Sequence, residues 1–299
     1  MRDLIGHTPL VKINYAFEQV EGIKLFAKLE YYNPSGSVKD RTGLYMVEDA
    51  IKDGRLKRGS TIVEATAGNT GLGVAFAALN QGFHVIFVVP EKFSEEKQIL
   101  MKALGADIIH TKREDGMLGA AAKAQELLSE IKDSISLQQF KNMSNPKAHY
   151  ETTGPEIYQE LDGKIDYLVA GAGSGGTYSG VVKFLKEQNP NIKGILADPV
   201  GSTMGGGEHA DYDIEGIGND FIADTMDMSL VDKVIKINDS QSFDGARALA
   251  RHEGILGGSS TGAAFSAALK LIYEHHVKGN IVFIAPDRGD RYFSKHLYA

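Results

Sequence analysis

The chain has 299 residues, 42% of them hydrophobic and 24% charged, and a net charge of −7 at pH 7. This composition predicts a soluble globular protein of about two domains or one large α/β unit, and the acidic balance disfavours nucleic-acid binding, which needs a basic stripe. The absence of cysteine excludes disulfides, thiolate metal sites and a cysteine nucleophile. With no signal-peptide pattern and no apolar run of membrane-spanning length, we expect a cytoplasmic protein that does not contact a membrane.

Strand-like apolar runs alternate with helical patterns along the chain. We expect strands at residues 24–30, 60–66, 84–90, 106–111, 166–173, 194–199 and 280–286. We expect helices at residues 41–54, 70–82, 94–105, 119–131, 177–188 and 242–254, with Ser94 as the N-cap of the third. Continuous apolar strands separated by helices predict an α/β fold with a parallel sheet covered on both faces.

Two segments interrupt this alternation. The polar stretch at residues 141–156 is the candidate crossover between two domains. Residues 199–220 form a long stretch with little periodicity, and loops of that length in compact proteins usually have a function.

The stretch NPSGSVKDR (residues 33–41) places Lys39 between an expected strand and an expected helix. The Pro, Ser and Gly residues before it favour a tight turn. A lysine held by such a turn at a strand-to-helix junction can be aimed into a cleft. A lysine that only covers the surface would not need this frame, so Lys39 is a candidate for chemistry.

A second strand-to-helix turn reads EATAGNTG (residues 64–71). Thr66, Asn69 and Thr70 offer hydroxyl and amide groups there, and the backbone N–H groups at a helix start favour an anion such as a carboxylate. Because Asn and Thr are also common N-caps, a purely structural role fits this motif equally well when it is read alone.

The glycine-rich stretch GAGSGGTYSG (residues 171–180) follows a strand and opens a helix. Such a turn lets N–H groups converge on a phosphate, with Ser174 and Thr177 as further donors; a plain tight turn is the simpler alternative. The spacing also fits GxGxxG, and Asp198 ends the next expected strand, so a nicotinamide or flavin dinucleotide is a rival ligand. The lack of GxxxxGK[ST] disfavours a P-loop nucleotide hydrolase.

The remaining motifs carry less information when each is read alone. GGSSTGAAF (residues 257–265) is most simply a tightly packed helix start, and PDRGDRY (residues 286–292) a charged turn. The histidines lack metal-ligand spacing and no GxSxG motif occurs. We therefore expect no metal site and no serine-hydrolase triad.

The lysine and the two anion-binding turns all follow expected strands of a parallel sheet, where such turns converge on one crevice. Pyridoxal phosphate needs this combination, because a lysine forms its Schiff base, a glycine loop holds its phosphate and a carboxylate site fixes the amino acid. A dinucleotide-binding oxidoreductase would not need the framed lysine and stays the more distant alternative.

Six stretches occur in the order seen in the cysteine synthase and cystathionine β-synthase family, which the chain resembles: NPSGSVKDR, EATAGNTG, LQQFKN, GAGSGGTYSG, EGIG and GGSSTGAAF. Ala67 makes the chain most similar to the bacterial O-acetylserine-dependent cystathionine β-synthases. The resemblance implies the two-domain, tryptophan-synthase-β-like fold of type II pyridoxal-phosphate enzymes. A smaller mobile domain would cover residues 38–142, and a larger cofactor domain residues 1–37 and 143–299.

The resemblance also implies residue roles. Lys39 resembles the Schiff-base lysine, Asn69 the residue that binds the phenolic oxygen of the cofactor, and Ser260 the hydroxyl residue that faces the pyridine nitrogen. The implied phosphate loop consists of Gly173, Ser174, Gly175, Gly176 and Thr177. The implied substrate-binding residues are Thr66, Ala67, Gly68, Thr70, Gln139, Gly216, Ile217 and Gly218.

The implied reaction is a β-replacement, in which O-acetyl-L-serine or L-serine loses its β-substituent and sulfide or homocysteine attacks the resulting aminoacrylate. The product is L-cysteine or L-cystathionine, with Lys39 as general base at Cα. Ser260 cannot keep the pyridine nitrogen protonated as an aspartate would, which disfavours transamination. A serine or threonine dehydratase and a cysteine-degrading lyase that releases sulfide are alternatives on the same fold. A catalytically idle binding partner is the non-enzymatic alternative.

Members of this family are normally homodimers, and the C-terminus of serine acetyltransferase often docks in the cleft of a cysteine synthase, so we expect these two kinds of partner. Asn219 departs from the family pattern, because the animal enzyme has an aromatic residue there. PDRGDRY also departs from the PSxGERY form. The sequence leaves open the donor, the nucleophile and the roles of Asn219 and Arg288.

Overall fold

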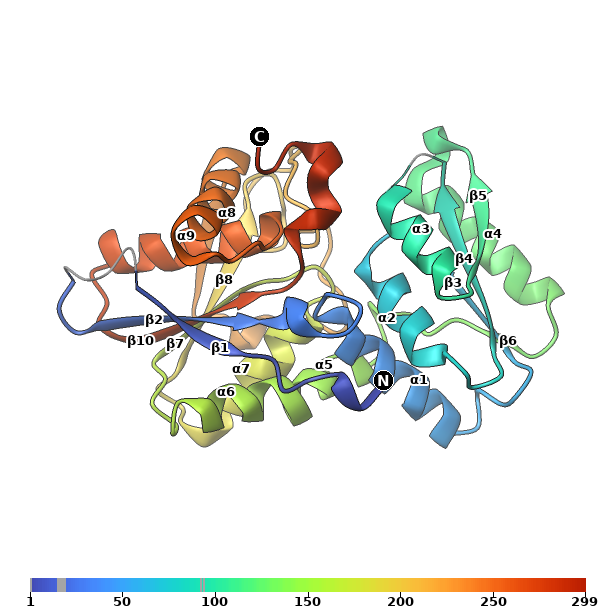
Figure 1. The fold of residues 1–299 in the computed structure, drawn as a ribbon, viewed down its shortest axis with the longest axis horizontal. Helices are drawn as coiled ribbons and strands as arrows, with labels where there is room; N and C mark the ends of the chain where they lie inside the picture. The colour runs from blue at the N-terminus through green and yellow to red at the C-terminus, as the bar shows by residue number, and fades with distance from the viewer. Residues whose placement is uncertain (1, 15–19, 92, 94) are drawn as a thin grey trace. The chain divides into compact units, whose positions relative to one another are not determined.

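The computed structural model describes residues 2–14, 20–91, 93 and 95–299, so the N-cap expected at Ser94 lies outside the described residues. The chain divides into two units, each built on its own sheet (Figure 1). The small unit comprises Met1–Ile5 and Lys39–Asn145, and the large unit comprises Gly6–Val38 and Pro146–Ala299. The domain boundaries and the mobility expected from the sequence stay predictions.

Within the described residues, the large unit has a six-stranded sheet with the strand order β1-β2-β10-β7-β8-β9. All neighbouring strands are parallel except β1 and β2. The strands are β1 (Leu10–Ile13), β2 (Ile23–Leu29), β7 (Tyr167–Gly171), β8 (Lys193–Pro199), β9 (Lys233–Ile237) and β10 (Gly279–Ala285). The parallel sheet is confirmed, whereas the sequence does not predict the short, lysine-containing edge strands β1 and β9.

Helices cover both faces of this sheet (Figure 1). They are α6 (Gly154–Glu160), α7 (Gly176–Gln188), α8 (Asp239–Glu253) and α9 (Ser259–Tyr273). Along β10, Ile281 and Phe283 join the core under α9, whereas Val282 and Ile284 join the core under α7. Both alternating sets are apolar, which is the pattern that a parallel strand buried on two faces requires.

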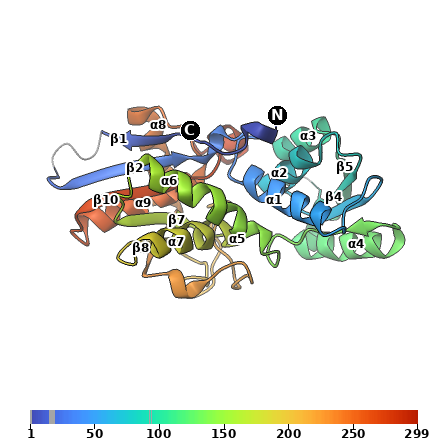
Figure 2. The same cartoon turned by 90° about the horizontal axis from the view of Figure 1, so that it is seen from below.

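The small unit has a parallel sheet with the order β5-β4-β3-β6 in its described residues. Its strands are β3 (Thr61–Ala65), β4 (His84–Pro90), β5 (Asp107–Thr111) and β6 (Ser134–Ile135). Its helices are α1 (Lys39–Lys52), α2 (Asn69–Ala78), α3 (Glu95–Ala103) and α4 (Gly116–Glu130). The helix α4 packs on one face of the sheet, and α2 and α3 lie on the other (Figures 1 and 2).

Short helical segments connect these elements. The 3-10 helices are Arg2–Leu4, Glu30–Tyr32, Arg113–Asp115, Met228–Leu230 and Gly289–Lys295. The short helix α5 (Ser144–Ala148) runs into a π-helical turn at His149–Thr153. In the part of the chain that the structure describes, no helix has the length and apolar character needed to cross a membrane.

The helices α1 and α2 touch through their backbones. A Cβ atom added to Gly73 of α2 would overlap the carbonyl oxygen of Lys39, and one added to Gly43 of α1 would overlap the backbone of Gly73. Only glycine permits this approach. The contact therefore holds the first turn of α1, where Lys39 stands, against the amino-terminal half of α2.

We expect Gly73→Ala to lower the free energy of unfolding by about 1–3 kcal/mol, because the added methyl group forces the two backbones apart. Urea unfolding followed by circular dichroism measures this change. Gly68→Ala is the matched control for stability, since no atom lies within 4 Å of a Cβ atom added at Gly68. Equal stability of Gly73→Ala and the wild type would contradict the contact.

Candidate active site

Lys39 is the first residue of α1 and follows directly on a stretch that is fixed to the large unit. The Gly36 N–H donates to the Asn33 carbonyl at 2.7 Å, which closes a turn. Two residues later, the Val38 N–H donates to the carbonyl of Pro286 at 2.8 Å, immediately beyond β10. The backbone just before the lysine is thus held on both sides of its turn.

The turn at residues 66–70 joins β3 to α2 in the small unit. Its N-cap is Gly68, which provides no side-chain cap for the first N–H groups of α2. The structural alternative of an Asn or Thr side-chain cap is therefore wrong. The Thr70 hydroxyl instead donates to Oε1 of Gln139 at 2.6 Å. This hydrogen bond fixes the Gln139 amide beside the helix start, where its NH₂ group is a donor for an anion.

The small unit therefore brings together three of the groups that the sequence singles out. The backbone of Lys39 contacts α2 at Gly73, the turn at residues 66–70 opens the same helix, and Gln139 bonds to Thr70. They lie beyond the carboxyl end of β3, and ligands of parallel sheets bind at the carboxyl ends of the strands. An amine, a helix start without a side-chain cap and an amide donor together suit an amino acid.

The glycine loop at residues 171–177 joins β7 to α7 in the large unit. Gly175 has a left-handed backbone with φ of 82° and is the N-cap of α7, again without a side-chain cap. A Cβ atom on Gly173 would lie 2.6 Å from the carbonyl oxygen of Gly216. The loop and the EGIG stretch are thus in backbone contact, and N–H groups at the start of α7 can serve a phosphate.

Three side chains hold this loop from behind. Asn219 Nδ2 donates to the Gly173 carbonyl at 2.6 Å, and the Thr225 hydroxyl donates to the Ser174 carbonyl at 2.5 Å. Nε2 of the buried His149 lies 3.2 Å from the Thr177 hydroxyl. The sequence leaves Asn219 unassigned and does not point to the other two. His149 stands in a π-helical turn, an irregularity that is frequent at functional sites but has no sequence signature.

Ser260 is buried in the first turn of α9, and the PDRGDRY stretch supports that turn. The Gly258 N–H donates to the Asp287 carbonyl at 3.0 Å, and the Tyr292 hydroxyl donates to the Asp287 carboxylate. Burial, reinforced by the charge of Asp287, raises the pKa of Tyr292 well above its ordinary value, so this hydroxyl stays a donor. The stretch that reads as a charged turn thus connects the Ser260 turn with the Val38 backbone.

Arg288 lies in the same stretch and is half exposed. It forms an ion pair with Asp290 at 2.8 Å. Its side-chain stem covers the turn before the lysine, because a Cβ atom on Gly36 would lie 2.9 Å from Arg288 Cδ. The structure therefore places Arg288 as a cover over the turn at residues 33–36.

Asp198 is the acid that would bind a ribose in a dinucleotide site. Its side chain is buried, and Oδ2 accepts from Lys236 Nζ at 2.5 Å and from the Gly205 N–H at 3.0 Å. A carboxylate that forms a buried ion pair does not present itself to a ribose hydroxyl. This arrangement argues against the dinucleotide alternative.

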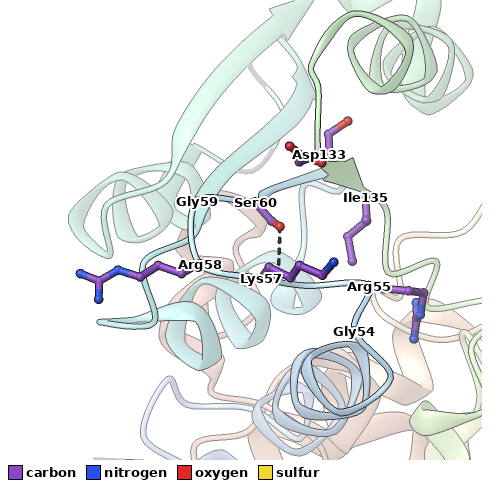
Figure 3. A pocket seen from close by; sticks show the side chains of 9 residues that line it. Gly54, Arg55, Lys57, Arg58, Gly59, Ser60, Asp133 and Ile135 are labelled. Atoms are coloured by element: carbon purple, nitrogen blue, oxygen red, sulfur yellow. Dashed lines mark hydrogen bonds between the residues drawn. The ribbon is translucent and has the colours of Figure 1, made fainter.

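A pocket of about 560 Å³ lies at the amino-terminal ends of β3 and β6 in the small unit (Figure 3). Its lining includes Arg55, Lys57, Arg58 and Asp133. The side chains of Arg55 and Arg58 extend away from each other, and the Lys57 N–H donates to the Ser60 hydroxyl at 3.0 Å. This pocket is separate from the candidate site, which lies at the carboxyl ends of the strands.

Pyridoxal phosphate requires a lysine for its aldehyde and a loop of N–H groups for its phosphate, and the chain contains both kinds of group. The family model described as "Pyridoxal-phosphate dependent enzyme" matches residues 1–287, and this chain belongs to that family. Its cofactor is pyridoxal phosphate. The glycine loop fits the phosphate group, since the close approach at Gly173 and the left-handed Gly175 leave no place for side chains there.

Similar proteins indicate which kind of pyridoxal-phosphate enzyme this chain resembles. An O-acetylserine dependent cystathionine beta-synthase of Bacillus subtilis is 49% identical over 99% of this chain and 96% of the relative. A cysteine synthase of Helicobacter pylori is 45% identical over 100% of this chain and 98% of the relative. The crystal structure of an O-acetylserine dependent cystathionine beta-synthase from Helicobacter pylori matches with a TM-score of 0.92 at 44% identity, covering 100% and 98% of the two chains. The family resemblance and the fold class are confirmed, while the individual residue roles stay predictions.

We expect Asn219→Ala to weaken cofactor binding about fivefold, because the Gly173 carbonyl loses a hydrogen bond of about 1 kcal/mol. Reconstituting the apoprotein with increasing pyridoxal phosphate and following the visible absorption band measures the dissociation constant. Asn191→Ala, at an exposed position beyond α7, is the control and should bind as the wild type does. An unchanged constant for Asn219→Ala would show that Asn219 does not support the loop.

Proposed function

We propose that this chain catalyses β-replacement on O-acetyl-L-serine or L-serine by a thiol nucleophile. Sulfide would give L-cysteine and homocysteine would give L-cystathionine. The observation that carries the proposal is the arrangement in the small unit, where Lys39 and a Thr70–Gln139 hydrogen bond frame the start of α2. Family membership and the names of the full-length relatives support the same reaction.

When bound, pyridoxal phosphate supplies an aldehyde that condenses with amines and a conjugated ring that withdraws electrons from Cα. In our proposal, Lys39 removes the proton from Cα of the donor amino acid and returns it after the nucleophile has added at Cβ. The turn at residues 66–70 and Gln139 hold the donor's carboxylate. This hold keeps the Cα–H bond pointed at the lysine amine.

In the large unit, the loop Gly173–Thr177 would hold the phosphate and Gly216–Gly218 would line the substrate side. Ser260 would face the pyridine nitrogen. A serine hydroxyl does not supply the charge with which an aspartate keeps that nitrogen protonated. The site would therefore favour departure of the β-substituent over transamination.

The donor and the nucleophile follow from the relatives rather than from the site. The Bacillus subtilis relative is named for O-acetylserine and for cystathionine. We therefore propose O-acetyl-L-serine as the donor and homocysteine as the nucleophile to test first, with sulfide as the second. Ala67, at the start of the α2 turn, agrees with the bacterial cystathionine-forming type.

The test mixes the holoenzyme with O-acetyl-L-serine or L-serine, adds homocysteine or sulfide separately, and identifies products by mass spectrometry. We expect cystathionine or cysteine to form only when the thiol is present. Lys39→Ala should lower the rate by roughly 10²–10⁴-fold through loss of the general base, while Lys52→Ala, at the other end of α1, should not. A keto acid formed without thiol, or full activity of Lys39→Ala, would overturn the proposal.

We also propose a cytoplasmic homodimer, supported by the family resemblance and by the lack of cysteine. Size-exclusion chromatography with light scattering should give twice the mass of the 32.4 kDa chain. A mass near one chain would contradict the dimer. Docking of a serine acetyltransferase C-terminus is a proposal from the resemblance alone. If it docks, a synthetic peptide with the C-terminal sequence of serine acetyltransferase should compete with the donor amino acid for binding.

A further inference from the structure

Glu64 stands near the carboxyl end of β3, two residues before Thr66, and has no part in the reaction described above. Its side chain points to the segment that carries Gln139. Oε1 accepts three hydrogen bonds: from the N–H of Leu137, from the N–H of Gln138 at 3.1 Å and from the hydroxyl of Ser136 at 2.9 Å. One carboxylate oxygen thus binds three consecutive residues.

Glu64 makes these hydrogen bonds because β6 is short. This strand pairs with β3 only through Thr61↔Ser134 and Ile62↔Ile135. Beyond Ile135 the chain leaves the sheet, so the following N–H groups do not find acceptors on β3 by strand pairing. Leu137 is buried and its N–H group needs a partner, so the Glu64 side chain supplies the acceptor that the backbone of β3 does not.

The same segment is bent by an unusual residue. Gln138 has a left-handed backbone with φ of 54°, a conformation that is unfavourable for a residue with a side chain and that persists only when its surroundings enforce it. On the carbonyl side, Asn142 Nδ2 donates to Leu137 at 2.8 Å and Asn145 Nδ2 donates to Gln139 at 2.9 Å. The N–H groups of Leu137 and Gln138 donate to the Glu64 carboxylate.

We infer that Glu64 is a positioning residue: it holds the segment of residues 136–139 so that the Gln139 amide meets Thr70 and sets the affinity for the donor's carboxylate. The inference rests on the proposed function, because it assigns Glu64 to the same carboxylate site. Glu64 acts through Gln139 and does not touch the donor.

The acceptor atom, and not the negative charge, is what this arrangement uses. Burial raises the pKa of Glu64 above its ordinary value, while the hydrogen bonds from Leu137, Ser136 and Gln138 oppose that rise. A glutamine retains an oxygen at the same place, whereas an alanine removes it. A carboxylate charge near the bound carboxylate would only oppose binding. Glu64→Gln should therefore bind the donor at least as well as the wild type.

The experiment compares the KM for O-acetyl-L-serine and kcat of the holoenzyme variants. Glu64→Ala should raise KM about tenfold with kcat within about twofold of the wild type, because the turn at residues 66–70 still orients a donor that has bound. Glu64→Gln should stay within about twofold in both. Glu91→Ala, an exposed carboxylate that follows the neighbouring strand β4, is the matched control and should leave both constants unchanged.

A double-mutant cycle tests whether Glu64 affects the KM for the donor through Gln139. If Glu64 acts through Gln139, adding Glu64→Ala to Gln139→Ala should change KM by less than about twofold. Multiplied effects of the two substitutions, or a Glu64→Gln variant as impaired as Glu64→Ala, would overturn the inference. If Glu64→Ala does not fold, Ser136→Ala is the second variant, because it removes one of the three hydrogen-bond donors to Glu64. Ser136→Ala should raise KM about twofold in the wild type and leave KM unchanged in the Gln139→Ala background. A rise in KM that persists in that background would overturn the inference.

Failure of the proposed function is distinguishable from failure of this inference. If no pair of donor and nucleophile gives product, the function is wrong. The cycle can then still be measured as binding of L-serine to the holoenzyme, followed by the change in its visible absorption band. Non-additive dissociation constants would support the coupling of Glu64 to Gln139, and additive ones would reject it.

Discussion

The backbone contact between α1 and α2 at Gly43 and Gly73 determines the geometry of the candidate binding groups in the small unit. Because no side chain separates the two helices, the residue that begins α1 stands beside the turn that begins α2. The backbone that carries Lys39 and the anion-binding groups at residues 66–70 therefore lie at neighbouring places on the small unit. Close packing of the two helix backbones thus fixes the distance between these two segments.

The large unit achieves the same precision by different means. Its anion-binding groups lie on loops, so side chains from other segments must hold the backbone in place. The side chains of Asn219 and Thr225 donate to carbonyl oxygens of the glycine loop, and the backbone carbonyl of Asp287 accepts from the turn that precedes Ser260. Loops positioned by a scaffold in this way commonly carry binding and catalytic residues.

The sequence predicts those parts of the structure whose cause is local. Apolar runs predict the central strands β7, β8 and β10, and glycine-rich turns between a strand and a helix predict candidate anion sites. The sequence does not predict the supports, because Glu64, His149 and Asn219 bond to groups that lie far from them along the chain. A two-residue strand such as β6 has no detectable pattern either. The dinucleotide alternative needed the structure as well, since only the ion pair with Lys236 shows that Asp198 is already engaged.

The strand order of the large unit has a consequence for how the chain acquires its structure during translation. β10, made of residues 279–285, lies between β2 and β7 in the sheet. The ribosome must therefore release residues 279–285 before β2 can pair with β10. The sheet of the small unit draws only on residues 61–135 and can form while the rest is still being made. Until β10 has been made, β2 can pair only with β1, and its other side stays open.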